Sequence, residues 1–461
     1  MANTSEELGL DGENISPLAL RTAILLFKDR VPKTLPVDRI GATAFISSSL
    51  VVNGAERQMT NTAVHMEKYR ASGAKLDGIK IEGPFQIVVY GHDLGKIKGR
   101  LLPLARAGNV RVWQVKKMRS HPLFEICPEN DQLRALEPVL PPRALAGVHR
   151  LVAHFRRHKT EIAYIWQDST FLLAGLAALI AGVPRIVFTA RGMPPNLQKF
   201  MYRDEYKDMH KALVQVPGVH YACNGSAAAE AYCRWLDIPM ERFTIVPNGV
   251  SLPEAKNIRK DTEKWSRFTQ ATSRSSNTIG GLFRFSEDKK PLFWISFARD
   301  FLTRDPDARF VLVGGRMDYV GSGNLLEEAQ ELARSYGIED RILFVGESEN
   351  ISYWLQKMDV SVLLSPFEGL PNALIEAQLA GVPIVATPAG SADETFLENE
   401  TGFLLSNAEN PPLSEICDKV EAVFALRARD INLSNKAMKH AGEKFSIDRM
   451  IRNTATLLNQ G

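Results

Sequence analysis

The stretch SPFEGLPNALIEAQ, at positions 365–378, is the part of the chain that most strongly determines its fold. Pro371 suits the first position of a helix, because its missing N–H would have no partner there. The apolar residues that follow predict a short buried helix, which leads into an apolar strand at 384–387. Glu368 then lies in the loop before the helix, and Glu376 lies inside it among apolar neighbours. The free N–H groups at such a helix start can hold a phosphate.

Seven residues separate Glu368 from Glu376, and the pair resembles the paired-glutamate motif of retaining GT-B glycosyltransferases of the GT4 type. The similarity also covers the surrounding EGLPNALIEA, the strand GVPIVAT, and Gly390, Glu394, Thr401 and Gly402 in the family's order. It is strong over about 278–405 and weaker over 42–250. The resemblance implies an α/β protein with the GT-B fold, in which two doubly wound Rossmann-like domains face each other across a cleft.

Length and composition agree with a two-domain globular protein. The chain has 461 residues, 45% hydrophobic and 24% charged. A net charge of +3 is too small to indicate nucleic-acid binding. The four cysteines are scattered without a CxxC pair, which indicates a reducing compartment and no disulfide framework.

The sequence contains no recognisable secretory signal or membrane span. The first twenty residues are polar and acidic, without a basic end or an apolar core. The most apolar run, Phe171 to Val183, has 13 residues, which is too short to cross a bilayer and predicts a buried helix. We therefore expect a cytoplasmic protein that can still contact the inner face of the membrane.

Apolar strand patterns alternate with helical patterns on both sides of a turn-rich break, VPNGV at 246–250. Such alternation is typical of parallel sheets covered by helices on both faces. We expect strands at 42–47, 85–90, 110–115, 162–166, 185–190, 219–223 and 243–246, then at 278–283, 309–313, 341–345, 360–364 and 384–387. Helices are expected at 55–69, 227–236 and 447–458, and within the polar segment 254–277.

The predicted domains follow from this pattern and from the resemblance. Residues 1–20 are expected to form a flexible tail, and 21–249 an acceptor-side Rossmann-like domain. Residues 250–445 would form the nucleotide-sugar-binding domain. The resemblance implies that the last helix, within 446–461, crosses back to the first domain.

Two cations follow the first strand of the second domain. Arg284 and Lys289, in GLFRFSEDKK at 281–290, resemble the family's strand–Arg–x4–Lys signature. The resemblance implies that both hold the diphosphate of the donor and act in catalysis. Arginine supplies paired planar donors, and lysine supplies a compact charge. Lys290 is the alternative to Lys289, and a solvated charged turn is the alternative role for the segment.

The two glutamates have different implied roles. The resemblance implies that Glu376 binds the ribose hydroxyls, and that Glu368 contacts the donor sugar where positive charge develops. Surface ion pairs are the alternative, which fits Glu376 poorly because an unpartnered buried carboxylate is costly. Backbone N–H groups of Gly369, Leu370, Asn372 and Ala373 are candidates for donor oxygens.

A glycine-containing turn follows the first strand. NGAERQ at 53–58 resembles the family's GGAER loop, which faces the donor diphosphate, so Gly54 is a candidate donor-binding residue. Asn53 replaces the first glycine, and asparagine tolerates a left-handed backbone better than most residues.

One position departs from the family. Many relatives have a histidine after the strand equivalent to 185–190, whereas this chain has Arg191. Arg191 could bind an anionic acceptor phosphate or the donor, but it cannot act as a base at physiological pH. A mechanism in which the leaving phosphate oxygen takes the proton fits this departure. Asp168, at another strand end, is the second acceptor-side candidate, and a helix cap is its alternative role.

We expect no catalytic metal and no cofactor other than the nucleotide sugar, which is a co-substrate. Asp305 and Asp307 form a D-x-D pattern, but it lies in a helix-to-strand turn where aspartate is ordinary. The histidines show no metal-ligand spacing. Basic residues at 96–100, 116–119 and 154–159 could dock on an anionic membrane, or could be ordinary solvated faces.

The resemblance therefore implies a retaining hexosyltransferase, and we expect it to be metal-independent. It would move a sugar from a nucleotide diphosphate, with UDP as the expected nucleotide, to a glycan or glycolipid acceptor in polysaccharide biosynthesis. A nucleotide-sugar epimerase of the same fold and a catalytically silent binding subunit of a polysaccharide assembly complex are the alternatives. Donor turnover with and without acceptor separates the three.

Overall fold

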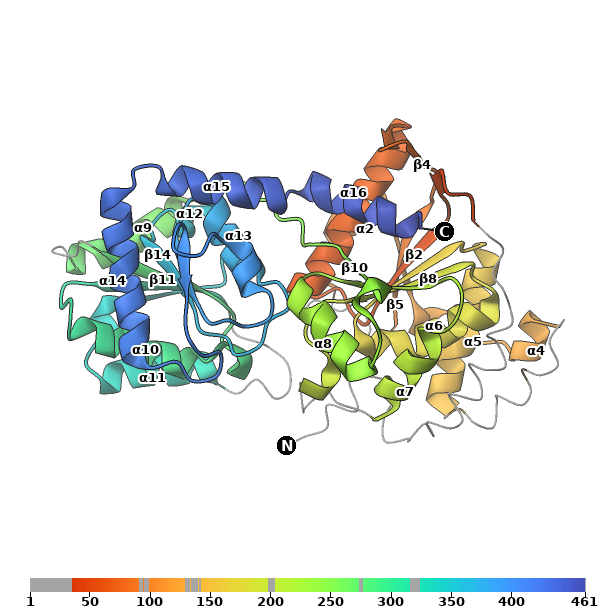
Figure 1. Ribbon diagram of the computed structural model, residues 1–461, viewed down its shortest axis with the longest axis horizontal. Helices are drawn as coiled ribbons and strands as arrows, with labels where there is room; N and C mark the ends of the chain where they lie inside the picture. The colour runs from red at the N-terminus through yellow and green to blue at the C-terminus, as the bar shows by residue number, and fades with distance from the viewer. Residues whose placement is uncertain are drawn as a thin grey trace. The chain divides into compact units, whose positions relative to one another are not determined.

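The computed structural model describes residues 35–90, 94, 99–128, 133, 140, 142–197, 204–272, 277–315 and 324–460. The chain divides into two compact units, drawn in Figure 1. The N-terminal unit contains the described residues up to Pro247 together with the chain from Asp448 on, and the C-terminal unit spans Asn248–Ile447. The predicted tail at 1–20 lies outside the described residues.

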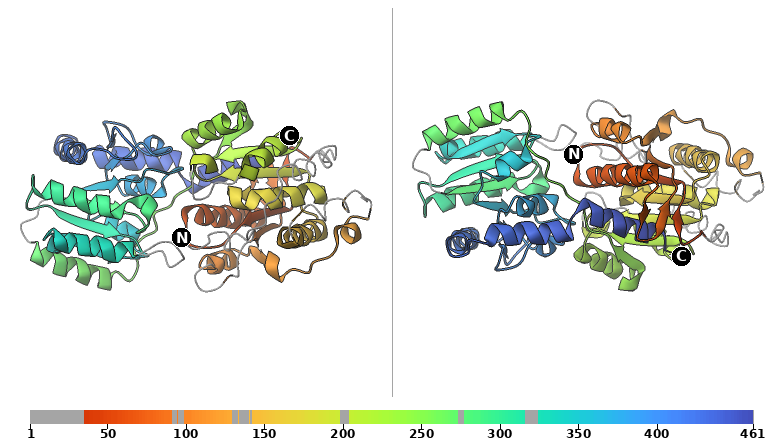
Figure 2. Two further views of the ribbon diagram at one scale, coloured as in Figure 1. Left: turned by 90° about the horizontal axis from the view of Figure 1, so that it is seen from below. Right: turned by 90° about the horizontal axis from the view of Figure 1, so that it is seen from above.

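A seven-stranded parallel sheet forms the centre of the N-terminal unit, in the order β10-β9-β8-β7-β2-β5-β6. Its strands confirm the predicted positions within one or two residues: β2 (Thr43–Ser47), β5 (Phe85–Val89), β6 (Arg111–Gln114), β7 (Ile162–Trp166), β8 (Arg185–Ala190), β9 (Val219–Cys223) and β10 (Phe243–Ile245). The central strands are apolar because helices cover both faces, as Figure 2 shows. These helices are α2 (Gly54–Ser72), α3 (Leu102–Ala107), α5 (Pro142–Arg157), α6 (Asp168–Ala181), α7 (Asp204–Leu213) and α8 (Ser226–Leu236). The short helix α4 (Leu123–Ile126) packs against α5.

The apolar run predicted to be a buried helix is α6, and it is buried over nearly its whole length. It ends at Gly182, whose φ of 72° is the left-handed conformation that glycine adopts without strain. None of the helices in the described part of the chain is both long and apolar enough to cross a bilayer.

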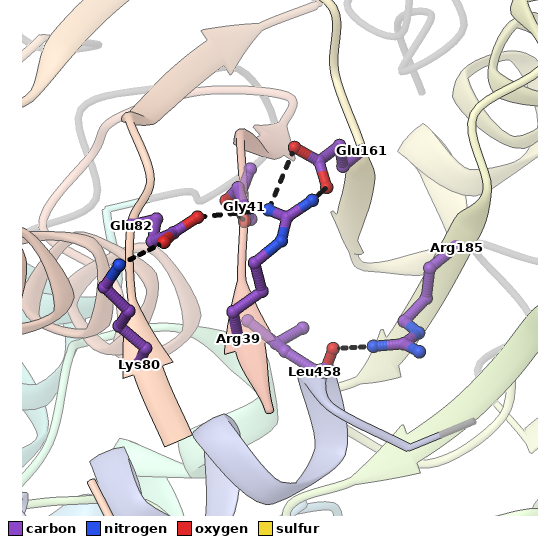
Figure 3. Close-up of polar contacts among 8 residues, drawn as sticks. Arg39, Gly41, Lys80, Glu82, Glu161, Arg185 and Leu458 are labelled. Atoms are coloured by element: carbon purple, nitrogen blue, oxygen red, sulfur yellow. Dashed lines mark hydrogen bonds and ion pairs between the residues drawn. The ribbon is translucent and has the colours of Figure 1, made fainter. Parts of the chain in front are cut away.

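The sequence did not predict a small second sheet in this unit, in the order β1 (Arg39–Ile40), β4 (Ile79–Ile81), β3 (Lys75–Leu76). These strands are too short to show a periodic pattern. One ion pair links this small sheet to the main sheet, because Arg39 lies 2.9 Å from Glu161, which precedes β7. Arg39 also lies 3.4 Å from Glu82, which follows β4, as Figure 3 shows.

The last helix, α16 (Ile447–Leu458), belongs to the N-terminal unit from its second residue on. Its apolar face is buried, and its polar side bonds to α2, where the Tyr69 hydroxyl donates to Asp448 over 2.8 Å. At its C-terminal end, the buried guanidinium of Arg185 donates to the carbonyl oxygen of Leu458 (Figure 3). A cation at this end also complements the negative pole of the helix dipole.

The C-terminal unit has a six-stranded parallel sheet, in the order β13-β12-β11-β14-β15-β16. The strands are β11 (Thr278–Leu282), β12 (Arg309–Val313), β13 (Ile342–Gly346), β14 (Val360–Leu363), β15 (Ile384–Ala386) and β16 (Gly402–Leu404), of which only β16 was not predicted. The helices are α9 (Arg259–Ala271), α10 (Pro291–Leu302), α11 (Leu325–Ser335), α12 (Ile351–Leu355), α13 (Asn372–Leu379), α14 (Leu413–Arg429) and α15 (Leu433–Lys444).

A small apolar cluster fixes the motif helix α13 in this unit. Leu370 and Ile375, from the loop and the helix, pack with Val250, Ala441 and Phe445. The backbone N–H of Val250 donates to the carbonyl of Phe445 over 2.8 Å. The start of the unit, the motif and the end of α15 are thereby held together.

Candidate active site

Arg284 is positioned by the residues on either side of it. Phe283 and Phe285 are buried, and their N–H groups donate to the carbonyl oxygens of Val313, the last residue of β12, and of Gly315 in the loop that follows. Gly314 permits this approach, since a Cβ there would lie 1.8 Å from the carbonyl oxygen of Phe283. The side chain of Arg284, between these two buried residues, is 38% exposed. It can therefore meet a ligand at the carboxyl end of β11.

Lys289 lies in the turn that follows and points at the glutamate loop. Its ammonium lies 2.6 Å from Oε1 of Glu368, and these side chains are only 13% and 14% exposed. Lys290 points elsewhere, because its ammonium donates to the carbonyl oxygen of Glu409 and to Oδ1 of Asn410. The structure thus brings Lys289, not Lys290, to Glu368.

Asp288, which no sequence motif indicated, lies among the same cations. Its Oδ2 is 3.2 Å from the Lys289 ammonium and 3.8 Å from the Arg284 guanidinium. The Ser286 hydroxyl donates to its other oxygen over 2.5 Å. Burial opposes its charge, but Lys289, Ser286 and Arg284 together hold the pKa of Asp288 below its ordinary value. Asp288 is therefore a carboxylate fixed beside both predicted diphosphate-binding cations.

The Lys289 ammonium is charged too, because the neighbouring carboxylates outweigh the effect of burial. Burial lowers its pKa, but Glu368 and Asp288 outweigh burial and raise the pKa of Lys289 above its ordinary value. The ammonium is shared between two carboxylates.

The loop that carries Glu368 is fixed by a close backbone approach. Gly390 has a φ of 57°, and a Cβ there would lie 2.1 Å from the carbonyl oxygen of Glu368. The N–H of Ser391 donates to the carbonyl of Gly369 over 2.8 Å. Gly390 therefore has a physical role, because a side chain at this position would prevent the close approach to the Glu368 loop.

The helix start differs by one residue from the prediction. Pro371 has a ψ of 110° and precedes the helix, which begins at Asn372. The N–H groups of Asn372 and Ala373 lie in the first turn of α13, where a helix offers no acceptors for them. Glu376 lies on α13 with 7% of its surface exposed.

Asn248 is a second residue that the sequence analysis overlooked. Its side-chain N–H₂ group donates to the carbonyl oxygen of Leu370 over 3.0 Å and to Oδ1 of Asn372 over 2.7 Å. The turn-rich break at 246–250 therefore also holds the start of the motif helix.

In the N-terminal unit, Gly54 is the first residue of α2. Asn53 precedes it with φ −104° and ψ 167°, which is extended backbone. The expectation of a left-handed backbone at Asn53 is therefore wrong, because the turn needs no left-handed residue at this position. Two residues further, the buried Glu56 accepts a hydrogen bond from Ser49 over 3.2 Å.

Arg191 follows β8, and its guanidinium lies over the Trp166 ring at 4.5 Å from the ring centroid. Burial lowers the pKa of Arg191 to about 10. The side chain therefore remains a cation at neutral pH, stabilised by the aromatic face, and cannot act as a general base there.

Asp168 is the first residue of α6, next to the end of β7, and it is held by two donors that the sequence did not indicate. Its carboxylate lies 3.0 Å from Nε2 of His210, which is 1% exposed, and accepts from the Tyr232 hydroxyl over 2.7 Å. Gln167, not Asp168, occupies the capping position, with φ 69°. The helix-cap alternative is therefore replaced by a buried three-residue network.

The D-x-D pattern is part of a structural turn. Asp305 accepts from Asn277 and from the N–H of Asp307, and Asp307 lies 3.8 Å from Arg341. Within the ranges that the structure describes, no three His, Cys, Asp or Glu side chains group as metal ligands.

Comparisons with known proteins agree with these observations. A family model described as "Glycosyl transferases group 1" matches residues 265–439, which include the glutamate pair and both cations. The Vi polysaccharide biosynthesis protein VipC/TviE of Salmonella typhi is 38% identical over 442 residues, 95% of this chain and 75% of its own length. A UDP-Gal:alpha-D-GlcNAc-diphosphoundecaprenol alpha-1,3-galactosyltransferase of Escherichia coli is 26% identical over 66% of this chain and 74% of its own.

Among solved structures, Anabaena HepE, crystallised in complex with UDP, superposes with a TM-score of 0.67 at 18% identity, covering 90% of this chain and 98% of its own. This likeness, with the two parallel sheets, confirms the GT-B fold class predicted above. The Salmonella relative and the family match show that the chain is a glycosyltransferase that belongs to the glycosyl transferases group 1 family.

Proposed function

We propose that the chain is a retaining transferase that moves a hexose-type sugar from a nucleotide diphosphate sugar to a glycan or glycolipid acceptor in polysaccharide biosynthesis. The observation that carries this proposal is the 2.6 Å contact between Lys289 and Glu368, with Arg284 beside it. It joins the cation segment and the glutamate segment into one candidate donor site. UDP is the proposed nucleotide, which the UDP-glucose complex of Anabaena HepE and the UDP-Gal named for the Escherichia coli relative support.

The proposed chemistry assigns each group in the C-terminal unit a role. Arg284 and Lys289 neutralise the diphosphate as its bond to the sugar breaks, which is the largest charge change in the reaction. Glu368 binds the sugar and stabilises the positive charge at its anomeric carbon. Glu376 binds the ribose hydroxyls. The first-turn N–H groups of α13 and the N–H groups of Gly369 and Leu370 bind donor oxygens.

Retention follows from attack on the face from which the diphosphate leaves. The acceptor oxygen bonds to the anomeric carbon, and its proton passes to the leaving phosphate oxygen. Arg191 at the expected histidine position supports this route, because a guanidinium remains protonated. The proposed reaction needs neither a metal ion nor a further cofactor.

We place the acceptor on the N-terminal unit, at the carboxyl ends of β7 and β8. Asp168 and Arg191 lie at these strand ends, and a cation there suits an acceptor that carries phosphate. The Escherichia coli relative is named for a diphosphoundecaprenol acceptor, which supports a lipid-linked diphosphate. Gly54, at the start of α2, is the proposed contact of this unit with the donor.

Peripheral contact with an anionic membrane at the cytoplasmic face is part of the proposal. Six exposed cations lie in two acid-free segments, one that runs from the start of the edge strand β6 into the turn after it, and one at the end of α5: Arg111, Lys116, Lys117, Arg119, Arg157 and Lys159. Such a group can attract anionic lipids. Sedimentation with vesicles containing anionic lipid, compared with neutral vesicles and at raised salt, tests this part.

Mass spectrometry of the products from a panel of nucleotide sugars and cell-envelope acceptors tests the function. Sugar transfer that needs both substrates supports the proposal. Conversion of the donor without acceptor would indicate an epimerase, and donor binding without turnover would indicate a silent subunit.

A further inference from the structure

Four charged side chains in the C-terminal unit form a neutral cluster. Arg284 and Lys289 contribute two positive charges, and Asp288 and Glu368 contribute two negative charges. The Lys289 ammonium lies within 3.2 Å of one carboxylate oxygen and within 2.6 Å of the other. A diphosphate that binds to these cations must therefore replace carboxylate contacts that are already made.

The two carboxylates differ in what holds them. Glu368 is on the motif loop, where the proposed function gives it the sugar as a partner. Asp288 is on the same turn as Lys289, and the Ser286 hydroxyl fixes its other oxygen. Its side chain is 34% exposed, so its charge is only partly screened by water. It cannot donate a hydrogen bond to a phosphate while it is ionised.

We propose that Asp288 is a resident counter-anion, which competes with the donor diphosphate for Lys289 and Arg284 and so promotes release of the nucleoside diphosphate after transfer. The inference rests on the proposed function, because it requires a diphosphate at these cations. The ionised carboxylate replaces the phosphate oxygens when the product leaves, so the two cations are not left without a counter-charge. It also repels the bound diphosphate at short range.

This role has a definite energetic sign. A residue that only orients Lys289 would strengthen diphosphate binding, and its loss would weaken binding. A competing anion weakens binding, and its loss strengthens it. Replacing Asp288 by asparagine keeps the shape and a hydrogen-bond acceptor for Ser286, but changes the cluster from neutral to a net charge of +1.

Calorimetry with UDP and with inorganic pyrophosphate tests the inference on the full-length chain. Asp288→Asn should bind both probes at least about fivefold more tightly than wild type, a change equal to roughly 1 kcal/mol. Glu287→Gln is the matched control. It removes the same charge from an exposed neighbour on the same turn, and its affinities should stay within about twofold of wild type.

Kinetics give a second readout. Asp288→Asn should show stronger product inhibition by UDP and a slower release of UDP in stopped-flow displacement, with melting curves showing a folded protein. If Asp288→Asn destabilises the turn, Asp288→Ser is the second variant that removes the negative charge, and the same measurements are made on it. Unchanged or weaker binding of both probes by folded variants would overturn the role of Asp288 alone. A wild-type protein that binds neither UDP nor GDP nor pyrophosphate would overturn the proposed function as well.

Discussion

The ammonium of Lys289 and the carboxylate of Glu368 lie 2.6 Å apart, although they are 79 positions apart in the sequence. One comes from the turn before α10 and the other from the loop before α13. Adjacent parallel strands, β11 and β14, bring these two loops to the same edge of the sheet. The contact turns two separate sequence motifs into one charged site, and the predictions below depend on it.

The two neighbouring lysines should behave differently. Lys289→Ala should weaken binding of UDP, because it removes one of the two cations proposed to bind the diphosphate. Lys290→Ala should leave the affinity for UDP within about twofold, because this lysine points elsewhere. Arg284→Ala should weaken UDP binding by about 2 kcal/mol or more, as expected for a charge-assisted contact. Isothermal titration of the folded variants measures all three. Equal losses in both lysine variants would show that net charge, not position, controls binding.

Glu376→Gln should affect donor binding more than turnover. The ribose keeps its contacts throughout the proposed reaction, so this change should raise the donor KM by about tenfold with a smaller change in kcat. The residue is buried on α13, so a melting curve must accompany the kinetics. An unchanged KM in a folded variant would remove Glu376 from the donor site.

Acid should destabilise the N-terminal unit through His154. Burial, aided by His158 and Arg157, lowers the pKa of His154 to about 3. Below pH 6.5 the unfolded chain binds a proton that the folded chain does not accept until about pH 3, so stability falls across this window. The loss is at most about 1.4 kcal/mol per pH unit for this one group.

Replacing the buried imidazole should flatten this dependence. Denaturant unfolding of His154→Phe between pH 7 and 4 should show a smaller loss of stability than wild type. His121→Gln, at an exposed imidazole, is the control and should follow wild type. Parallel curves for His154→Phe and wild type would contradict a neutral buried His154.

Removing divalent ions should not stop the reaction. The proposed charge neutralisation rests on Arg284 and Lys289, so initial rates in EDTA should stay within about twofold of those in magnesium. Complete loss of turnover in EDTA, restored by a divalent ion, would show that a metal takes part.

The sequence predicted the strands of both sheets closely, because each is an apolar run between turn residues. It did not reveal β1, β3 or β4, because each has only two or three residues and one of them is charged, so that no apolar run marks the strand. It also did not reveal the three-residue strand β16. The motif residues could be recognised because their order and spacing along the chain resemble those of the family. The partners of Asp168 could not be recognised, because His210 and Tyr232 reach it from other helices. Asp288 was visible in the sequence, but an acid beside two cations reads as an ordinary solvated turn until distances are known.

The central claim is that Glu368 stabilises charge at the sugar during transfer, and steady-state kinetics of Glu368→Gln test it most directly. Once a donor and acceptor pair is identified, the account predicts that kcat falls by about a hundredfold or more, with UDP affinity unchanged or tighter because Lys289 loses a competing carboxylate. Circular dichroism and a melting curve establish that the variant is folded. A folded Glu368→Gln protein with wild-type kcat would contradict the proposed site, although the fold would still stand.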